Sequence, residues 1–172
     1  MQLHPDEPLI IEGIHALNPM LLNDDIDRDK LFRVYVSALT TLNIDDHNRI
    51  HTTDARLLRR LVRDYETRGA SMEHTLSMWP SVRRGEEKWI FPYQENADAL
   101  FNTTLVYEVS VLKKYVYPLL QEVPKESPCY AAARDITKVL NYFLDADGIE
   151  DEIPPTSILR EFIGGCTFYR KD

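Results

Sequence analysis

The sequence predicts an α/β fold, with a parallel sheet flanked by helices and a helical C-terminal extension after it. Short β-branched or alternating apolar runs predict three strands, at residues 9–11, 32–36 and 99–102. Apolar residues at helical spacing predict amphipathic helices, at residues 55–67, 72–79, 106–121 and 130–144. Strands that alternate with helices favour an α/β layer over a helical bundle. Three strands are few for a free-standing parallel sheet, so we expect the sheet to be incomplete.

Composition and charge exclude several classes of protein. The chain has 172 residues, of which 44% are hydrophobic and 28% charged, as is typical of one soluble globular domain. Its polar start, and the lack of an apolar run of about 20 residues, argue against a signal peptide and a membrane span. The net charge of −8 argues against nucleic acid and anionic membranes as partners. Cys129 and Cys166 have no metal-ligand spacing, so reduced thiols and a cytoplasmic location are expected. No internal repeat is evident.

A basic segment interrupts this acidic chain. Between residues 55 and 69, five arginines stand against Asp64 and Glu66, a local charge of +3, which leaves −11 for the other residues. Leucines form one face of the predicted helix, and Gly69 predicts its end. Four of the arginines lie on the opposite face, within an arc of about 100°; these are Arg56, Arg59, Arg60 and Arg63.

This arginine face predicts a site for a small anionic ligand. Guanidinium groups carry a permanent charge and bind phosphate through planar, bidentate hydrogen bonds. On a mobile helix they are suited to closing over a nucleotide and excluding water. The alternative is a solvated helix face, with Arg60–Asp64 and Arg63–Glu66 as intrahelical ion pairs.

Glu12 is the candidate metal ligand. It follows the predicted strand at residues 9–11, and open α/β sheets bind their ligands at the carboxyl ends of their strands. A carboxylate there is suited to Mg²⁺, which takes one or two carboxylates together with phosphate oxygens and water. The alternative is that Glu12 merely ends the strand and faces solvent. No glycine-rich phosphate-binding loop occurs in the sequence.

Taken in order, these segments resemble the second half of the uridine kinase/phosphoribulokinase family. The resemblance covers about residues 8–105 and rests on four segments: residues 9–17, 32–36, 56–69 and 96–100. The arginine segment is the most specific of these, through its RR-x-x-RD-x-x-x-RG spacing. The family implies the C-terminal portion of a P-loop kinase. Residues 1–105 then form the second half of the kinase domain, with lid helices at about 54–88, and residues 106–172 form the helical extension.

The resemblance also implies an activity and roles for individual residues. The activity is an ATP-dependent phosphotransferase that moves the γ-phosphate of ATP to the 5′-hydroxyl of a nucleoside such as uridine, with Mg²⁺ as cofactor. The resemblance assigns Glu12 to the magnesium. It assigns Arg60 and Arg63 to catalysis beside the nucleoside and phosphates. It assigns Arg63, Arg68 and Arg59 to the phosphates of ATP.

The sequence departs from the family where activity is concerned. Ser77 or Met78 stands where uridine kinases have a base-reading glutamine, which leaves the nucleoside open. The family's phosphate-binding loop, first strands and catalytic aspartate precede the glutamate strand, and eleven residues precede Glu12 here. We therefore expect the chain alone to be inactive, with the N-terminal portion of a parent protein as its partner. Two alternatives remain: a kinase for a sugar phosphate or pantothenate-like alcohol, and a non-catalytic binding or dimerisation module that forms a homo-oligomer.

Overall fold

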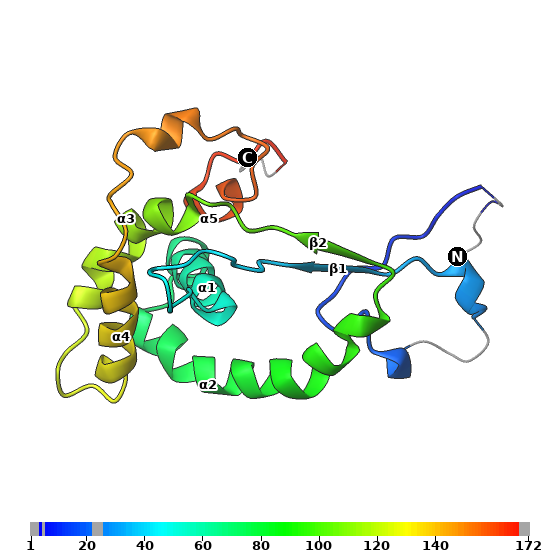
Figure 1. Ribbon diagram of the computed structural model, residues 1–172, viewed down its shortest axis with the longest axis horizontal. Helices are drawn as coiled ribbons and strands as arrows, with labels where there is room; N and C mark the ends of the chain where they lie inside the picture. Colours follow the sequence, from blue (N-terminus) through cyan, green and yellow to red (C-terminus); the bar gives the residue numbers. More distant parts are fainter. Residues whose placement is uncertain (1–3, 5, 22–25, 169–172) are drawn as a thin grey trace. The chain divides into compact units, whose positions relative to one another are not determined.

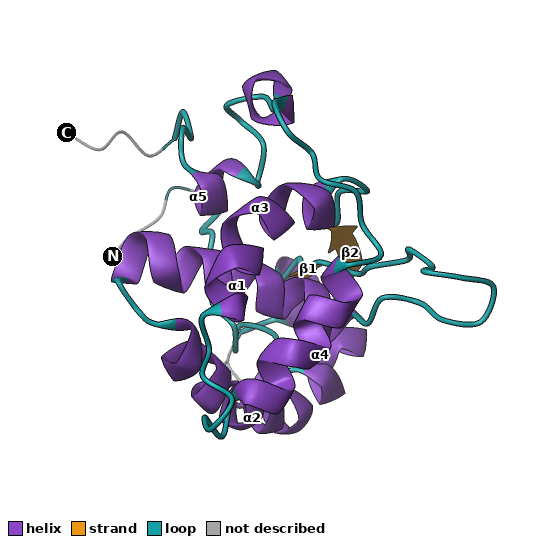
Figure 2. Cartoon of the chain, turned by 90° about the vertical axis from the view of Figure 1, so that its left-hand side faces the viewer, coloured by secondary structure: helices purple, strands orange, loops and turns teal. Residues whose placement is uncertain are grey.

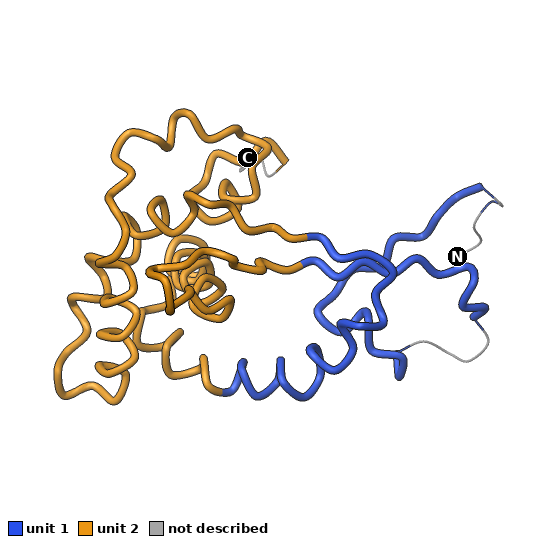
Figure 3. Tube along the Cα trace, in the orientation of Figure 1, with its two compact units in different colours: residues 1–36, 81–101 blue, residues 37–80, 102–172 orange. Residues whose placement is uncertain are grey.

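The chain divides into two compact units, as a computed structural model of it shows (Figures 1 and 3). The structure describes residues 4, 6–21 and 26–168. Unit 1 comprises Met1–Val36 and Ser81–Phe101, and unit 2 comprises Ser37–Pro80 and Asn102–Asp172. The fold is α/β with helices dominant. Its sheet has two parallel strands among the described residues, β1 (Val34–Ser37) and β2 (Ala99–Asn102). The predicted class is therefore confirmed, with one strand fewer than expected.

β1 and β2 correspond to the second and third predicted strands. The amides of Asp98 and Ala99 donate to the Arg33 carbonyl at 2.8 and 3.1 Å, and the Thr103 amide donates to the Ser37 carbonyl at 2.9 Å. An ion pair joins the starts of the two strands. The Arg33 guanidinium donates to both carboxylate oxygens of Asp98 at 3.0 and 3.2 Å, and the Arg33 amide donates to the same carboxylate at 2.7 Å. Asp98 thus has a structural role at the entry to the sheet.

The strand predicted at residues 9–11 is not formed. The chain has no regular secondary structure there, and the Ile10 side chain is 87% exposed. A strand is stable only when its backbone N–H and C=O groups pair with a neighbour. Among the described residues the sheet contains β1 and β2 alone, so the segment has no partner strand. A 3-10 turn, Pro19–Leu21, follows this segment. Further 3-10 turns are Arg28–Lys30 and Phe91–Asn96.

Unit 2 is built around α1 (Thr52–Arg68), which packs against α3 (Glu108–Gln121) and α5 (Arg160–Ile163) (Figure 2). α4 (Tyr130–Leu140) packs on α3, and a 3-10 turn, Ile149–Glu152, follows it. The apolar stripe of α1 meets that of α3 in one buried cluster, which includes Leu57, Leu58, Leu61, Val62, Val109, Leu112 and Val116. The predicted lid helix and the predicted C-terminal extension therefore share one hydrophobic core.

The ends of α1 and α2 show which local signals decide where a helix stops. α1 ends at Gly69, which adopts a left-handed φ of +62° and donates its amide to the Asp64 carbonyl. Its N-cap is His51, which makes no side-chain capping bond. α2 (Met72–Trp89) begins as predicted, with the Ser71 hydroxyl accepting from the His74 amide at 3.2 Å. α2 continues through Pro80, although proline removes one intrahelical donor.

A buried ion pair joins α1 to α3. Arg59 donates to the Glu108 carboxylate at 2.5 Å, and to the carbonyl and hydroxyl of Thr103 at 2.7 and 3.1 Å. Both charged side chains are buried. The same Glu108 oxygen accepts from the Leu105 amide at 2.9 Å, in the manner of a helix-capping glutamate. The ring of Phe162 on α5 lies 5.6 Å from the guanidinium carbon. Arg59 therefore ties α1 to both helices that cover it.

The extension contains a repeated capping motif that was missed in the sequence. Residues 123–129 and 153–159 share the pattern apolar-Pro-x-x-Ser-x-apolar, and both apolar positions are buried in each copy. In each copy the serine amide donates to the proline carbonyl, at 3.0 and 2.9 Å. The serine hydroxyl accepts from the amide two residues further on, at 3.2 and 3.3 Å. The first copy leads into α4 and the second into α5. Among the described residues, none of the helices has the length and apolar character of a bilayer span.

Glu108→Gln is predicted to destabilise the protein by about 3–5 kcal/mol, because it leaves the buried Arg59 guanidinium without its counter-charge. The double variant Arg59→Met with Glu108→Leu should recover most of this loss, since it removes both desolvated charges. Urea unfolding followed by circular dichroism measures the change. Glu126→Gln, at an exposed carboxylate in the same unit, is the matched control. An E108Q variant as stable as the wild type would contradict a stabilising role for the pair.

The Arg33–Asp98 pair predicts a pH dependence of strand pairing. Hydrogen bonds from the Arg33 side chain, and then from its amide, hold the pKa of the Asp98 carboxyl below its ordinary value. The contribution of the charged carboxylate is therefore present at neutral pH and lost as the pH falls through that lowered pKa. In an NMR titration, the Asp98 and Ala99 amide signals should shift together with the Asp98 carboxyl carbon. Asp98→Asn should abolish these shifts, and a carboxyl that titrates as in an unfolded peptide would refute the pairing.

Candidate functional site

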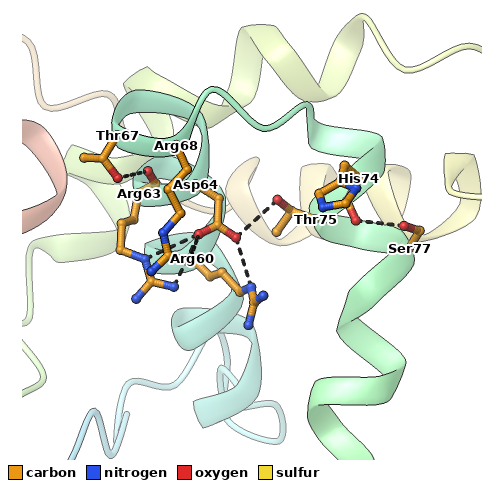
Figure 4. A network of polar contacts seen from close by, with 8 residues as sticks. All are labelled: Arg60, Arg63, Asp64, Thr67, Arg68, His74, Thr75 and Ser77. Carbon is orange, nitrogen blue, oxygen red and sulfur yellow. Dashed lines mark hydrogen bonds and ion pairs between the residues drawn. The ribbon is translucent and has the colours of Figure 1, made fainter.

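Three of the predicted phosphate-binding arginines converge on one carboxylate near the end of α1 (Figure 4). We call Arg60, Arg63 and Arg68 the arginine cluster. The Asp64 carboxylate accepts from Arg60 Nε at 3.1 Å, from Arg63 Nε and Nη2 at 3.4 and 3.3 Å, and from Arg68 Nη1 at 3.0 Å. The Asp64 side chain is 6% exposed, whereas the three arginine side chains are 22%, 30% and 57% exposed. The cluster thus surrounds a buried anion with partly accessible cations.

The helical period explains why these residues meet. Arg60 precedes Asp64 by four residues and Arg68 follows it by four, so all three lie along one face of α1. Arg63 pairs with Asp64, where the sequence suggested Glu66 as its partner. The Arg60–Asp64 pair was foreseen from the sequence, but the central place of Asp64 was missed. The signal was the symmetric spacing of arginines on either side of it.

Asp64 is held in place by contacts that involve no arginine. The Thr75 hydroxyl lies at the start of α2, inside unit 2, and donates to the carboxylate at 3.4 Å. The backbone carbonyl of Asp64 accepts from the Gly69 amide and, at 2.9 Å, from the Ala70 amide. The turn between α1 and α2 therefore fixes both the main chain and the side chain of Asp64.

The charges in the arginine cluster do not balance. Three guanidinium groups against one carboxylate leave a net charge of +2. Each guanidinium has five N–H donors, and Arg60 uses one of them and Arg68 one in the contacts to Asp64. The remaining donors on these partly exposed groups are suited to an anion that carries several oxygens and more than one negative charge.

Two further residues that were predicted for the site, Arg59 and Glu12, lie outside the cluster. Arg59 is in the core of unit 2, where its two terminal nitrogens donate to Glu108 and Thr103 and its Nε has no hydrogen-bond partner among the described residues. Glu12 is exposed in unit 1, in the irregular segment before the turn in which the Ala16 amide donates to the Gly13 carbonyl at 3.0 Å. Over the described part of the chain, no three His, Cys, Asp or Glu side chains are grouped so as to hold a metal ion.

The predicted substitutes for a base-reading glutamine are both on α2. The Ser77 hydroxyl donates to the His74 carbonyl of its own helix at 2.7 Å (Figure 4). Met78 is exposed. Neither the hydrogen bond of Ser77 nor the exposure of Met78 identifies a nucleobase.

Comparison with known proteins matches more than half of the chain to one family. A sequence profile described as the Phosphoribulokinase / Uridine kinase family matches residues 2–110. Relatives include the uridine kinases of Staphylococcus aureus strains JH9, Newman and JH1, each 32% identical over 97 residues. The aligned region covers 56% of this chain and 39% of each relative, so the chain spans about two-fifths of their length. No solved structure matches the chain. Because the profile covers more than half of the sequence, including Glu12 and the whole arginine cluster, the chain belongs to the phosphoribulokinase/uridine kinase family.

Proposed function

We propose that the chain is part of an ATP-dependent nucleoside kinase of the uridine type, and that the arginine cluster binds phosphate groups in it. The observation that carries this proposal is the convergence of three guanidinium groups on Asp64, with a net positive charge on a partly exposed face. The cluster lies within residues 2–110, the region matched by the family profile, and the chain is similar to enzymes named uridine kinase. An exposed charge excess of this kind in a chain of net charge −8 is suited to a small anion.

The proposed reaction is a phosphoryl transfer. The 5′-hydroxyl oxygen of the nucleoside attacks the γ-phosphorus of ATP, and the bond from that phosphorus to the β–γ bridging oxygen breaks. ADP leaves with the electron pair, and the hydroxyl proton passes to an aspartate outside these 172 residues. Catalysis of such transfers consists mainly of positioning and charge stabilisation. We assign Arg60 and Arg63 to the transferring phosphoryl group, and Arg63 and Arg68 to the phosphates of ATP.

Arg59 and Glu12 have separate parts in the proposal. Arg59 acts on the site by fixing α1 against α3 and α5, since its guanidinium is engaged in the core. The exposed Glu12 carboxylate is a hard oxygen donor that fits Mg²⁺, with phosphate oxygens and water as the remaining ligands. Bound there, magnesium would neutralise charge on the phosphate chain. A small-molecule substrate, a cytoplasmic location and the absence of nucleic-acid binding complete the proposed function.

A second candidate function is a binding or dimerisation module, which one observation favours. Unit 1 exposes large apolar side chains on β1, on β2 and in the segment before them, among them Ile10, Ile11, Phe32, Leu100 and Phe101. Apolar residues in such number at a sheet with an open edge call for a covering partner. In the kinase proposal that partner is the N-terminal portion of the parent protein, and in the alternative it is a second copy of the chain. A sugar phosphate or pantothenate-like alcohol is the alternative substrate.

Arg68→Gln in this chain is predicted to weaken the binding of inorganic tripolyphosphate about tenfold, because one charge-assisted hydrogen bond to phosphate is lost. Isothermal titration calorimetry measures the affinity. Arg134→Gln removes the same charge from an exposed arginine on α4, and its effect should be about twofold or less. Equal losses in the two variants would show that overall charge, and not the cluster, governs binding.

The isolated chain is predicted to show no ATP-dependent turnover, because its sequence holds no phosphate-loop backbone amides or lysine to cradle the triphosphate. ADP release is measured with ATP, Mg²⁺ and a panel of uridine, cytidine, a sugar phosphate and pantothenate. The full-length uridine kinase of Staphylococcus aureus is the positive control. Turnover by the purified chain above that of an Arg63→Gln variant would overturn this prediction.

A further inference from the structure

The strongest unexplained feature of the molecule is the position of Asp64. A phosphate-binding group of arginines gains nothing in charge from a carboxylate at its centre, since the carboxylate repels the ligand. Nevertheless Asp64 contacts all three members of the arginine cluster and is 6% exposed. Its carboxylate therefore either weakens the binding of an anionic ligand or holds the three guanidinium groups in the arrangement that binds it.

Geometry favours the second possibility. Arg60, Arg63 and Arg68 carry like charges that repel one another when their guanidinium groups approach. Each side chain also has about 2 kcal/mol of rotamer entropy, which keeps it dispersed unless a partner holds it. A carboxylate has two acceptor oxygens, and those of Asp64 take four hydrogen bonds from these three arginines and a fifth from the Thr75 hydroxyl. It is the shared partner that brings the three positive charges together.

The carboxylate itself is fixed before any ligand arrives. Thr75 donates to the same oxygen that accepts from Arg60, and the Asp64 carbonyl caps the end of α1. The Asp64 carboxylate is held by Thr75 of α2 and by the hydrogen-bonded backbone of its own residue, so it has little freedom to move toward the arginines. The three arginines converge on it instead, so that their guanidinium groups meet at one carboxylate.

We propose that Asp64 is a positioning residue, whose buried carboxylate assembles the arginine cluster into one binding group for the polyphosphate chain of a nucleoside triphosphate. This inference rests on the proposed function, in which the cluster binds phosphate. Asp64 does not touch the ligand. It acts through the three arginines, at the expense of one unit of favourable charge.

Asp64→Asn separates positioning from charge, because the two accounts predict opposite signs. If charge alone mattered, removing a negative group would tighten the binding of an anion. If Asp64 positions the cluster, the amide cannot hold three guanidinium groups, and affinity for inorganic tripolyphosphate should fall about tenfold or more. Glu66→Gln is the matched control, since it removes one negative charge from an exposed site two residues further along α1. Its affinity should be unchanged or slightly higher.

Thr75→Val provides a second and milder test. It keeps the shape of a buried side chain and removes the hydroxyl that orients Asp64, so binding should weaken about threefold. Circular dichroism and thermal unfolding confirm that each variant is folded, and T75V decides the question if D64N does not fold. A D64N protein that is folded and binds as tightly as the wild type, or an unaffected T75V, overturns the inference while the proposed function stands. A wild-type chain that does not bind tripolyphosphate contradicts the proposed function itself.

Discussion

The structure of unit 2 depends on the burial of one face of α1. Leu58, Leu61 and Val62 are closed in by α3 and α5, and the Arg59–Glu108 pair fixes the rotation of α1 about its axis. A helix that buries one face must present its other residues elsewhere. This constraint leaves the side chains of Arg60, Arg63 and Arg68 partly exposed, in contact with Asp64 near the end of α1. The predicted C-terminal extension is distant in sequence from α1, the predicted lid helix, yet its helices α3 and α5 pack against α1.

Three of the arginine–carboxylate contacts of the chain differ in their charge balance. Arg33 with Asp98 and Arg59 with Glu108 are one-to-one pairs, which neutralise charge and join segments distant in sequence. Asp64 takes three arginines, all from its own helix, so the contact joins nothing distant and leaves a surplus of positive charge. A structural role is sufficient to explain the balanced pairs. The surplus of positive charge around Asp64 is suited to an anionic ligand, and its place inside the family match supports our proposal that this ligand is a phosphate chain.

Local signals carried most of the sequence-based predictions that the structure confirms. The leucine stripe and Gly69 predicted α1 and its end, and apolar residues at helical spacing predicted the start of α2, because capping and periodicity act over a few residues. The run at residues 9–11 failed as a strand because strand formation requires a partner, which local sequence does not reveal. A helical wheel grouped Arg59 with the arginines predicted to bind the ligand, because a wheel considers only residues of the same helix. The partner of Arg59 in the structure, Glu108, lies 49 residues further on. Roles for Glu12 and for the arginines remain predictions.

The central claim is that the arginine cluster is a phosphate site assembled on α1. The most direct measurement follows the side-chain Nε–Hε signals of the arginines by NMR while inorganic tripolyphosphate is added to the full chain. The account predicts saturable shifts at Arg60, Arg63 and Arg68, with the signal of Arg33 unchanged because its partner is Asp98. Absent shifts in the cluster, or shifts of equal size at Arg33, would contradict it.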